Sequence, residues 1–250
     1  MEEPKEDAYS SVVTSNSVQL FITLAALNNL DVLSADIQNA YLTAKVTGKY
    51  WYRAGLEFGF DCGRPAIIVR ALYGLKSTGA TFRAHLASTL RSMGFQSCKA
   101  DPDVWMRKAT KPDKSKYYEY ILAYVDDIIG CSHNIKAVFE DIGSRFKFKE
   151  GSVQEPELYL GADIQKWYID DAPNPNKPQW ALSSTKYTRK AIAEVDLELK
   201  KVGRQLVKKA STPLASGYRP ELDTSPELDS TRQTYYQGLI GVLRWICELG

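Results

Sequence analysis

Residues 120–131 read YILAYVDDIIGC. Its two apolar runs, 120–125 and 128–131, are rich in aromatic and β-branched side chains, which predicts two buried strands. Between the runs stand two adjacent carboxylates, Asp126 and Asp127. A two-residue hairpin turn at this point would place both acids at a sharp, exposed bend.

The adjacent carboxylates indicate either metal chemistry or an ordinary turn. Two carboxylates at one bend repel each other and resist ionising together. Mg²⁺ would remove that repulsion because it prefers hard oxygen ligands, and metal-assisted phosphoryl transfer is a chemistry that uses such a pair. Aspartate is also a frequent turn residue, so the pair alone leaves a purely structural role open.

The composition is that of a soluble globular protein. Hydrophobic residues make up 44% and charged residues 25% of the 250 residues, enough for one large domain or two small ones. The cysteines are widely separated and histidines are scarce, which argues against a zinc site. These residues are Cys62, Cys98, Cys131, Cys247, His85 and His133. Scattered free thiols fit an intracellular reducing compartment.

Charge and hydropathy restrict the class of function. Residues 1–7 are polar and acidic, which argues against a signal peptide. No apolar run approaches the length of a membrane span, so no membrane partner is expected. The net charge is only +2, which is low for a protein that grips nucleic acid unaided.

Apolar spacing and capping residues predict an α+β fold. Helices are expected at residues 17–30, 78–93, 134–146, 184–200 and 235–249. Strands are expected at residues 32–37, 50–53, 67–72, 104–107, 118–125, 128–131, 157–165 and 179–183. Ser17 and Asn134 are expected as N-caps, and Gly94 as a C-terminal cap. These elements together predict a mainly antiparallel sheet packed by helices, followed by a small helical C-terminal part.

A third carboxylate, Asp36, lies near the end of the strand expected at residues 32–37. If this strand lies beside the hairpin that carries Asp126 and Asp127, three carboxylates converge on one point. Three acids can hold two divalent ions, one activating an attacking hydroxyl and the other stabilising a leaving pyrophosphate. The sequence therefore predicts a metal site at this end of the sheet.

Several motifs, in a fixed order, resemble one family. They are SADIQNAYL at residues 34–42, ALYGLK at 71–76, GF at 94–95, ADPD at 100–103, YVDD at 124–127, YLGADI at 159–164 and STPL at 211–214. The set, from about Tyr9 to the end of the chain, is similar to the reverse transcriptase of copia-type (Ty1/copia) LTR retrotransposons. The resemblance implies a reverse-transcriptase-like palm with Mg²⁺ or Mn²⁺ as cofactor. It also implies an RNA or DNA primer-template and deoxynucleoside triphosphates as partners.

The resemblance also implies roles for residues of the metal site and the primer end. Asp36, Asp126 and Asp127 match the catalytic, metal-binding aspartates of the palm. The backbone carbonyl of Ile37 would be a further metal ligand. Tyr124 and Val125, which precede the aspartate pair, would abut the primer end.

Three further residues match positions that bind the nucleotide. Tyr41 matches the aromatic gate that excludes a ribose 2′-hydroxyl, while Gly74 and Lys76 match the segment that lines nucleotide and template. Each has a structural alternative that the sequence leaves open. Tyr41 fits a core position, Gly74 fits a simple turn, and Lys76 fits a solvated surface charge.

The resemblance suggests an organisation in three parts. Residues 1–199 are expected to form a palm-like catalytic core with the fingers largely missing, because only 35 residues precede Asp36. Residues 200–230 are expected to be an irregular, basic, Pro-rich connector, and residues 231–250 a thumb-like helix.

Two classes of function remain open on the sequence. The first is the core of an RNA-directed DNA polymerase that uses a two-metal mechanism. The second is a truncated or domesticated relic that acts as a structural subunit among protein partners in a larger assembly, since a fold does not prove an activity. The spacing of Tyr41 from Asp36 argues against a third idea, an unrelated two-metal phosphotransferase or nuclease.

Overall fold

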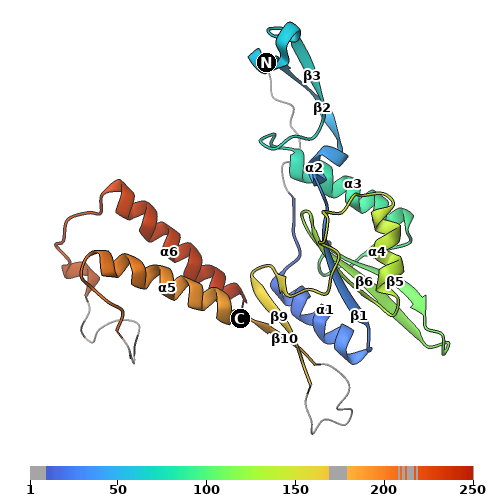
Figure 1. Cartoon of the computed structure of the whole chain (residues 1–250). Helices are drawn as coiled ribbons and strands as arrows, with labels where there is room; N and C mark the ends of the chain where they lie inside the picture. The colour runs from blue at the N-terminus through green and yellow to red at the C-terminus, as the bar shows by residue number, and fades with distance from the viewer. Residues whose placement is uncertain are drawn as a thin grey trace. The chain divides into compact units, whose positions relative to one another are not determined.

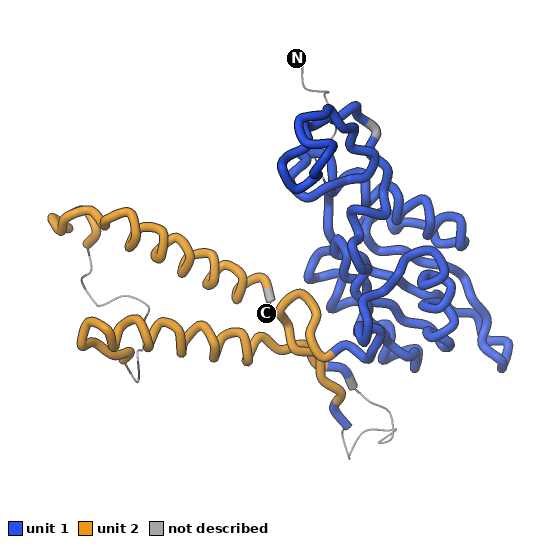
Figure 2. The backbone as a smooth tube through the Cα atoms, turned by 45° about the horizontal axis from the view of Figure 1, so that its top comes forward, with its two compact units in different colours: residues 1–156, 167–180 blue, residues 157–166, 181–250 orange. Residues whose placement is uncertain are grey.

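The computed structural model describes residues 10–168, 179–207, 209, 212, 217 and 219–249. Backbone contacts divide the chain into two compact units (Figure 2). The first unit consists of residues 1–156 with 167–180, and the second of residues 157–166 with 181–250.

An antiparallel sheet forms the centre of the first unit (Figure 1). Its strands lie in the order β1-β7-β6-β5-β4. Their bounds are β1 Asp31–Asp36, β4 Gln96–Ser97, β5 Val104–Thr110, β6 Lys116–Tyr124 and β7 Asp127–Ser132. Each neighbouring pair runs antiparallel, so the predicted combination of antiparallel sheet and helices is confirmed.

Both faces of this sheet bury apolar side chains. Ile121, Ala123 and Ile128 join one buried cluster with helices α3 (Thr78–Ser92) and α4 (Ile135–Gly143). The helices contribute Phe82, Leu86, Ala87, Leu90, Ile135, Val138, Phe139 and Ile142. Leu122 and Ile129 are also buried, and strand alternation directs them to the opposite face. Burial on both faces explains why β6 and β7 read as continuous apolar runs.

Two of the three predicted helix caps are confirmed. Asn134 Oδ1 accepts the Ala137 amide at 3.4 Å and caps α4, and Gly94, with φ +87°, follows α3; both were predicted. Helix α1 (Ser15–Leu27) begins earlier than expected, because Thr14 and not Ser17 is its N-cap. The Thr14 hydroxyl oxygen accepts the Ser17 amide, so Ser17 lies inside the first turn.

A short helix and a hairpin connect β1 to α3. The elements are α2 Ala40–Thr43, β2 Lys45–Arg53, the 3₁₀ helix η1 Leu56–Asp61 and β3 Pro65–Arg70. Strands β2 and β3 pair antiparallel, and their register shifts between Lys45 and Tyr50. Because this irregularity interrupts the alternation of side chains, the pattern predicted only residues 50–53 of β2.

The second unit contains a small sheet and a helical region. Its sheet has the order β10-β9-β8, and its strands and helices are β8 Leu158–Tyr159, β9 Ala162–Trp167, β10 Gln179–Ser183, α5 Thr185–Lys201, the 3₁₀ helix η2 Pro220–Leu222 and α6 Ser230–Leu249. The continuous strand predicted at residues 157–165 is wrong. Leu160 and Gly161 have φ values of 52° and 81°, and they form a hairpin turn that divides it.

Some expectations stay predictions. Most of the motif at residues 211–214 lies outside the described residues. The division into residues 1–199, 200–230 and 231–250 also remains a prediction, because the compact units follow backbone contacts and not motifs. Within the described ranges, no helix combines the length and the apolar character that crossing a bilayer requires.

Gly130 of β7 is packed so closely that a side chain would collide. A Cβ placed there would lie 2.5 Å from Ile121 Cδ1 and 3.0 Å from Phe139 Cε2. We expect Gly130→Ala to lower the free energy of unfolding by about 1–3 kcal/mol, the usual cost of overpacking a core. Denaturant-induced unfolding of the variant and the wild type measures this difference.

Gly238→Ala in α6 is the matched control for this substitution. A Cβ at Gly238 meets nothing within 4 Å. The control should keep or slightly raise stability, because alanine favours a helix over glycine. Equal stability of Gly130→Ala and wild type would contradict the close packing of α4 on the hairpin.

Candidate active site

Three of the predicted site residues form a row across the sheet. Tyr124 of β6 lies directly opposite Asp127 of β7, which lies directly opposite Asp36 of β1. Directly opposed residues point to the same face, with Cβ atoms about 4.5–5.5 Å apart. The condition stated for the metal site, that the Asp36 strand lies beside the hairpin, is therefore met. Strand alternation places this row on the face opposite α3 and α4.

The hairpin turn consists of Val125 and Asp126, and not of the two aspartates as the sequence predicted. Asp127 is the first residue of β7, because its pairing with Asp36 extends that strand. Val125 has a φ of +57°, whereas the φ of Asp126 is not positive, which is the pattern of a type II′ turn. A β-branched residue at positive φ is strained by about 1–3 kcal/mol.

Backbone hydrogen bonds fix the strand end that carries Asp36. The Ile37 amide donates to the Asp126 carbonyl at 2.9 Å, which ties β1 to the turn. The amide and carbonyl of one strand residue point to the same side, so the Ile37 carbonyl also faces the turn. On the other side, the Lys149 amide donates to the Asp36 carbonyl at 2.9 Å, and the Asp36 amide donates to Ser152 Oγ at 3.2 Å.

The pKa of Asp127 lies above its usual value. Partial burial is the main cause, and the charges of Asp126 and Asp36 add to it, whereas Lys149 acts in the opposite direction. The Asp127 residue is nevertheless exposed to solvent. The charges of the other two predicted ligands therefore act against ionisation of Asp127.

Tyr41 of α2 stands beside this group. Its ring meets Tyr73 edge-on, with ring centroids 4.7 Å apart, and meets Phe82 in the same way at 6.0 Å. The pKa of Tyr41 is raised by its burial, and next by the negative charge of Asp126. Tyr41 therefore combines a packed ring, as the core alternative expected, with proximity to the aspartates.

Gly74 and Lys76 lie in the loop between β3 and α3, which also carries Tyr73. Gly74 has a φ of +98°, a conformation that favours glycine, so its structural role in the turn is clear. Lys76 is exposed. The contact of Tyr73 with Tyr41 brings this loop to the edge of the site.

The predicted ligands, three carboxylates and the Ile37 carbonyl, suit a divalent metal by their chemistry and by their positions at the ends of neighbouring strands. Carboxylate and carbonyl oxygens are the ligands that Mg²⁺ and Mn²⁺ prefer. The carboxylates are not gathered, since the described residues contain no group of three or more His, Cys, Asp or Glu side chains that could hold an ion. A bound cation would offset the charges of Asp126 and Asp36, which contribute to the raised pKa of Asp127.

Sequence reasoning missed Lys149 and Ser152, which support Asp36 from outside the hairpin. The missed signal was the alternation Phe146-Lys147-Phe148-Lys149, because a period of two predicts an extended segment. Ile37 and Phe148 indeed form an antiparallel bridge.

Comparison with known proteins defines the class. Residues 2–172 match the family described as reverse transcriptase (RNA-dependent DNA polymerase), and the chain belongs to this family. The resemblance to copia-type reverse transcriptases is confirmed by relatives named retrovirus-related Pol polyproteins from transposons. RE2 and RE1 of Arabidopsis thaliana are each 23% identical over 96% of this chain. TNT 1-94 of Nicotiana tabacum is 24% identical over 84% of it. The aligned region spans only 15% of the length of each relative.

We expect Asp127→Asn to stabilise the metal-free protein at pH 7. When the pKa of an acid is higher in the folded than in the unfolded protein, the folded state is favoured at low pH. The stability that the acid contributes is complete below its pKa in the unfolded protein and is lost as the pH rises through its pKa in the folded protein. Removing the charge should therefore raise the free energy of unfolding, by less than about 1 kcal/mol because the group is exposed. The gain should vanish below about pH 3.5, where the carboxyl is protonated in both states.

Denaturant unfolding in EDTA across this pH range measures the effect. Asp113→Asn is the control with the opposite sign, because hydrogen bonds from Ser115 lower the pKa of Asp113. Asp113→Asn should therefore be destabilising at pH 7. A destabilised Asp127→Asn protein at that pH would contradict the repulsion described for the site.

Proposed function

We propose that the first unit is the catalytic palm of an RNA-directed DNA polymerase of the copia type. The observation that carries the proposal is the direct cross-strand pairing of Asp36 with Asp127, next to the Asp126 turn, in a chain of the reverse transcriptase family. Nothing in the structural relic alternative requires three mutually repelling carboxylates at one end of a sheet.

Asp36, Asp126 and Asp127, with the Ile37 carbonyl, would hold Mg²⁺ or Mn²⁺. Divalent ions bound there supply a two-metal mechanism, which activates the primer 3′-hydroxyl and stabilises the leaving pyrophosphate. The protein contributes rigid placement of the ligands. Asp36 is fixed through its backbone, and the Asp126 carbonyl is fixed by the Ile37 amide.

The primer-template and a deoxynucleoside triphosphate would approach this group of acids. Tyr124 extends the row of Asp36 and Asp127 by one strand, which suits contact with the primer end. Val125 forms the turn at the same edge. Gly74 and Lys76 would line the nucleotide from the loop that contacts Tyr41 through Tyr73.

Tyr41 would exclude ribonucleotides. Its ring is held by Tyr73 and Phe82 and lies close enough to Asp126 for that charge to raise its pKa. A rigid ring beside the metal ligands leaves less room for a 2′-hydroxyl on a nucleotide bound at the site.

We expect Mg²⁺-dependent extension of a primed RNA template, which Asp126→Asn should reduce about 1,000-fold, equivalent to about 4 kcal/mol of transition-state stabilisation. Single-turnover extension measures the rate. Asp141→Asn is the matched control, because Asp141 is an exposed acid of α4 whose partner Arg145 is 4.0 Å away. The control should extend at nearly the wild-type rate. Equal rates for Asp126→Asn and wild type would refute the polymerase proposal.

Tyr41→Ala should raise the use of ribonucleotides relative to deoxynucleotides by roughly 10- to 100-fold, because it removes the steric basis of discrimination. The ratio of kcat/KM values for the two nucleotides measures the change. Tyr118→Ala, at a tyrosine of β6 remote from the turn, should leave the ratio unchanged. An unchanged ratio in Tyr41→Ala would show that Tyr41 is only a packing residue.

A further inference from the structure

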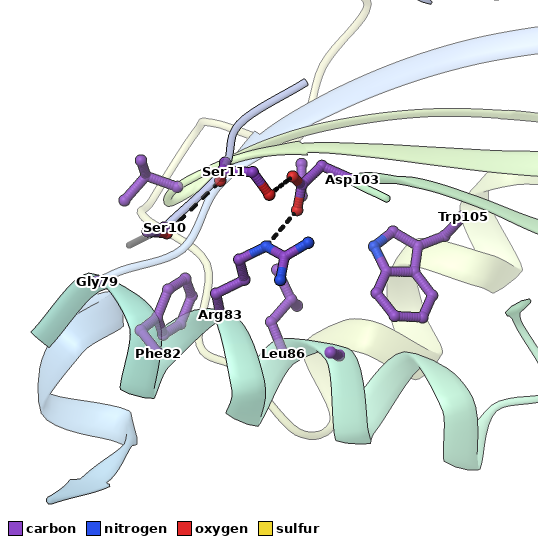
Figure 3. A pocket seen from close by; sticks show the side chains of 11 residues that line it. Ser10, Ser11, Gly79, Phe82, Arg83, Leu86, Asp103 and Trp105 are labelled. Carbon is purple, nitrogen blue, oxygen red and sulfur yellow. Dashed lines mark hydrogen bonds and ion pairs between the residues drawn. The ribbon is translucent and has the colours of Figure 1, made fainter. Parts of the chain in front are cut away.

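A buried ion pair connects helix α3 to the residue that precedes β5. Arg83 Nε donates to Asp103 Oδ1 at 2.7 Å, and the Ser11 hydroxyl donates to the other Asp103 oxygen (Figure 3). Asp103 is only 3% exposed. A buried carboxylate is tolerated only when it is paired and hydrogen-bonded, so the three groups hold each other in place.

Asp103 is also joined to the end of β6. Its carbonyl accepts the Ala123 amide at 3.1 Å, and the Ala123 carbonyl accepts the Val13 amide at 3.3 Å. Val125, two residues after Ala123, lines the same small cavity as Arg83 and Asp103. This cavity has a volume of about 10 Å³. Val125 and the ion pair therefore lie on the walls of one cavity, which has room for at most about one water molecule.

Val125 needs such support because it holds a φ of +57°. Strained conformations persist only where the surroundings determine them from several sides. The position of the turn matters for the acids, because the Asp126 carbonyl accepts the Ile37 amide and Asp127 follows directly.

We infer that Arg83 and Asp103 are positioning residues, whose ion pair holds the Val125–Asp126 turn in its strained form. The pair thereby fixes Asp126 and Asp127 relative to Asp36. The kinetic part of this inference rests on the proposed polymerase function, whereas its metal-binding part does not.

The same sheet offers a matched control pair at the other end of the hairpin. Arg107 Nη2 lies 2.7 Å from Glu119 Oε2, and the two side chains are 28% and 9% exposed, against 34% and 4% for Arg83 and Asp103. Glu119 also accepts the hydroxyl of Ser132, the last residue of β7. Arg107 also donates to the Met93 carbonyl at 2.7 Å, so breaking this pair should cost at least as much stabilisation as breaking the first, without touching the turn.

The kinetic test compares Arg83→Gln with Arg107→Gln in primer extension. Arg83→Gln should lower kcat by roughly 10- to 100-fold, because a misplacement of about 1 Å can cost about 100-fold. Its nucleotide KM should stay within about threefold, since the loss falls on the transition state. Arg107→Gln should keep its kcat despite a similar fall in Tm, and Arg83→Lys, which keeps a cation at Asp103, should recover most of the rate.

Electron paramagnetic resonance of free Mn²⁺ gives a readout that does not depend on activity. Arg83→Gln should weaken Mn²⁺ binding about tenfold, as loss of a supporting partner typically does, whereas Arg107→Gln should not. Equal effects of the two glutamine variants on kcat and on Mn²⁺ affinity would overturn the positioning role and leave the polymerase proposal intact.

The two proposals fail in distinguishable ways. A wild-type chain that binds Mn²⁺ but extends no primer refutes the polymerase proposal, and the Mn²⁺ affinities of the variants then decide the positioning role alone. A chain that neither extends nor binds Mn²⁺ refutes both. If Arg83→Gln does not fold, the same comparison is made by replacing the acid of each ion pair. Asp103→Asn is then the test variant and Glu119→Gln its control.

Discussion

The antiparallel pairing of β1 with β7 determines which side chains meet at the candidate site. Only in this register do Asp36 and Asp127 oppose each other, because a slip of one residue would turn Asp36 toward the buried face. Ala35 and Ile128, the preceding pair, are both buried and hold the register. Burial of apolar side chains, and not any attraction between the acids, therefore places Asp36 and Asp127 at facing positions of neighbouring strands.

The same pairing concentrates unfavourable terms at one turn. Asp127 is harder to ionise than an ordinary aspartate, and Val125 adopts a strained backbone conformation. The adjacent core can sustain both costs, since Ile128 and Ile129 are almost fully buried and contribute about 1.5–3 kcal/mol each. Repulsion and strain at one position, surrounded by good packing, are typical of a site kept for binding or chemistry.

The strands that build the site could be predicted because their apolar runs are local signals, and the Asp36 strand was correctly expected beside the hairpin. The position of the turn could not be predicted, because the length of β7 depends on pairing with a strand about 90 residues earlier in the chain. The pair of Arg83 and Asp103 was equally hidden, since residues 20 apart without periodicity give no sequence signal. Local patterns thus predicted the elements and the acids, whereas the supporting contacts depend on tertiary packing.

The most direct test of the account measures Mn²⁺ affinity in wild type, Asp36→Asn, Asp127→Asn and the double variant. If the paired strands present both carboxylates to one ion, each single substitution should weaken binding strongly. The double variant should then bind little worse than either single variant, because residues of one site couple. Losses that simply add, or binding that neither substitution changes, would contradict a shared metal site across β1 and β7.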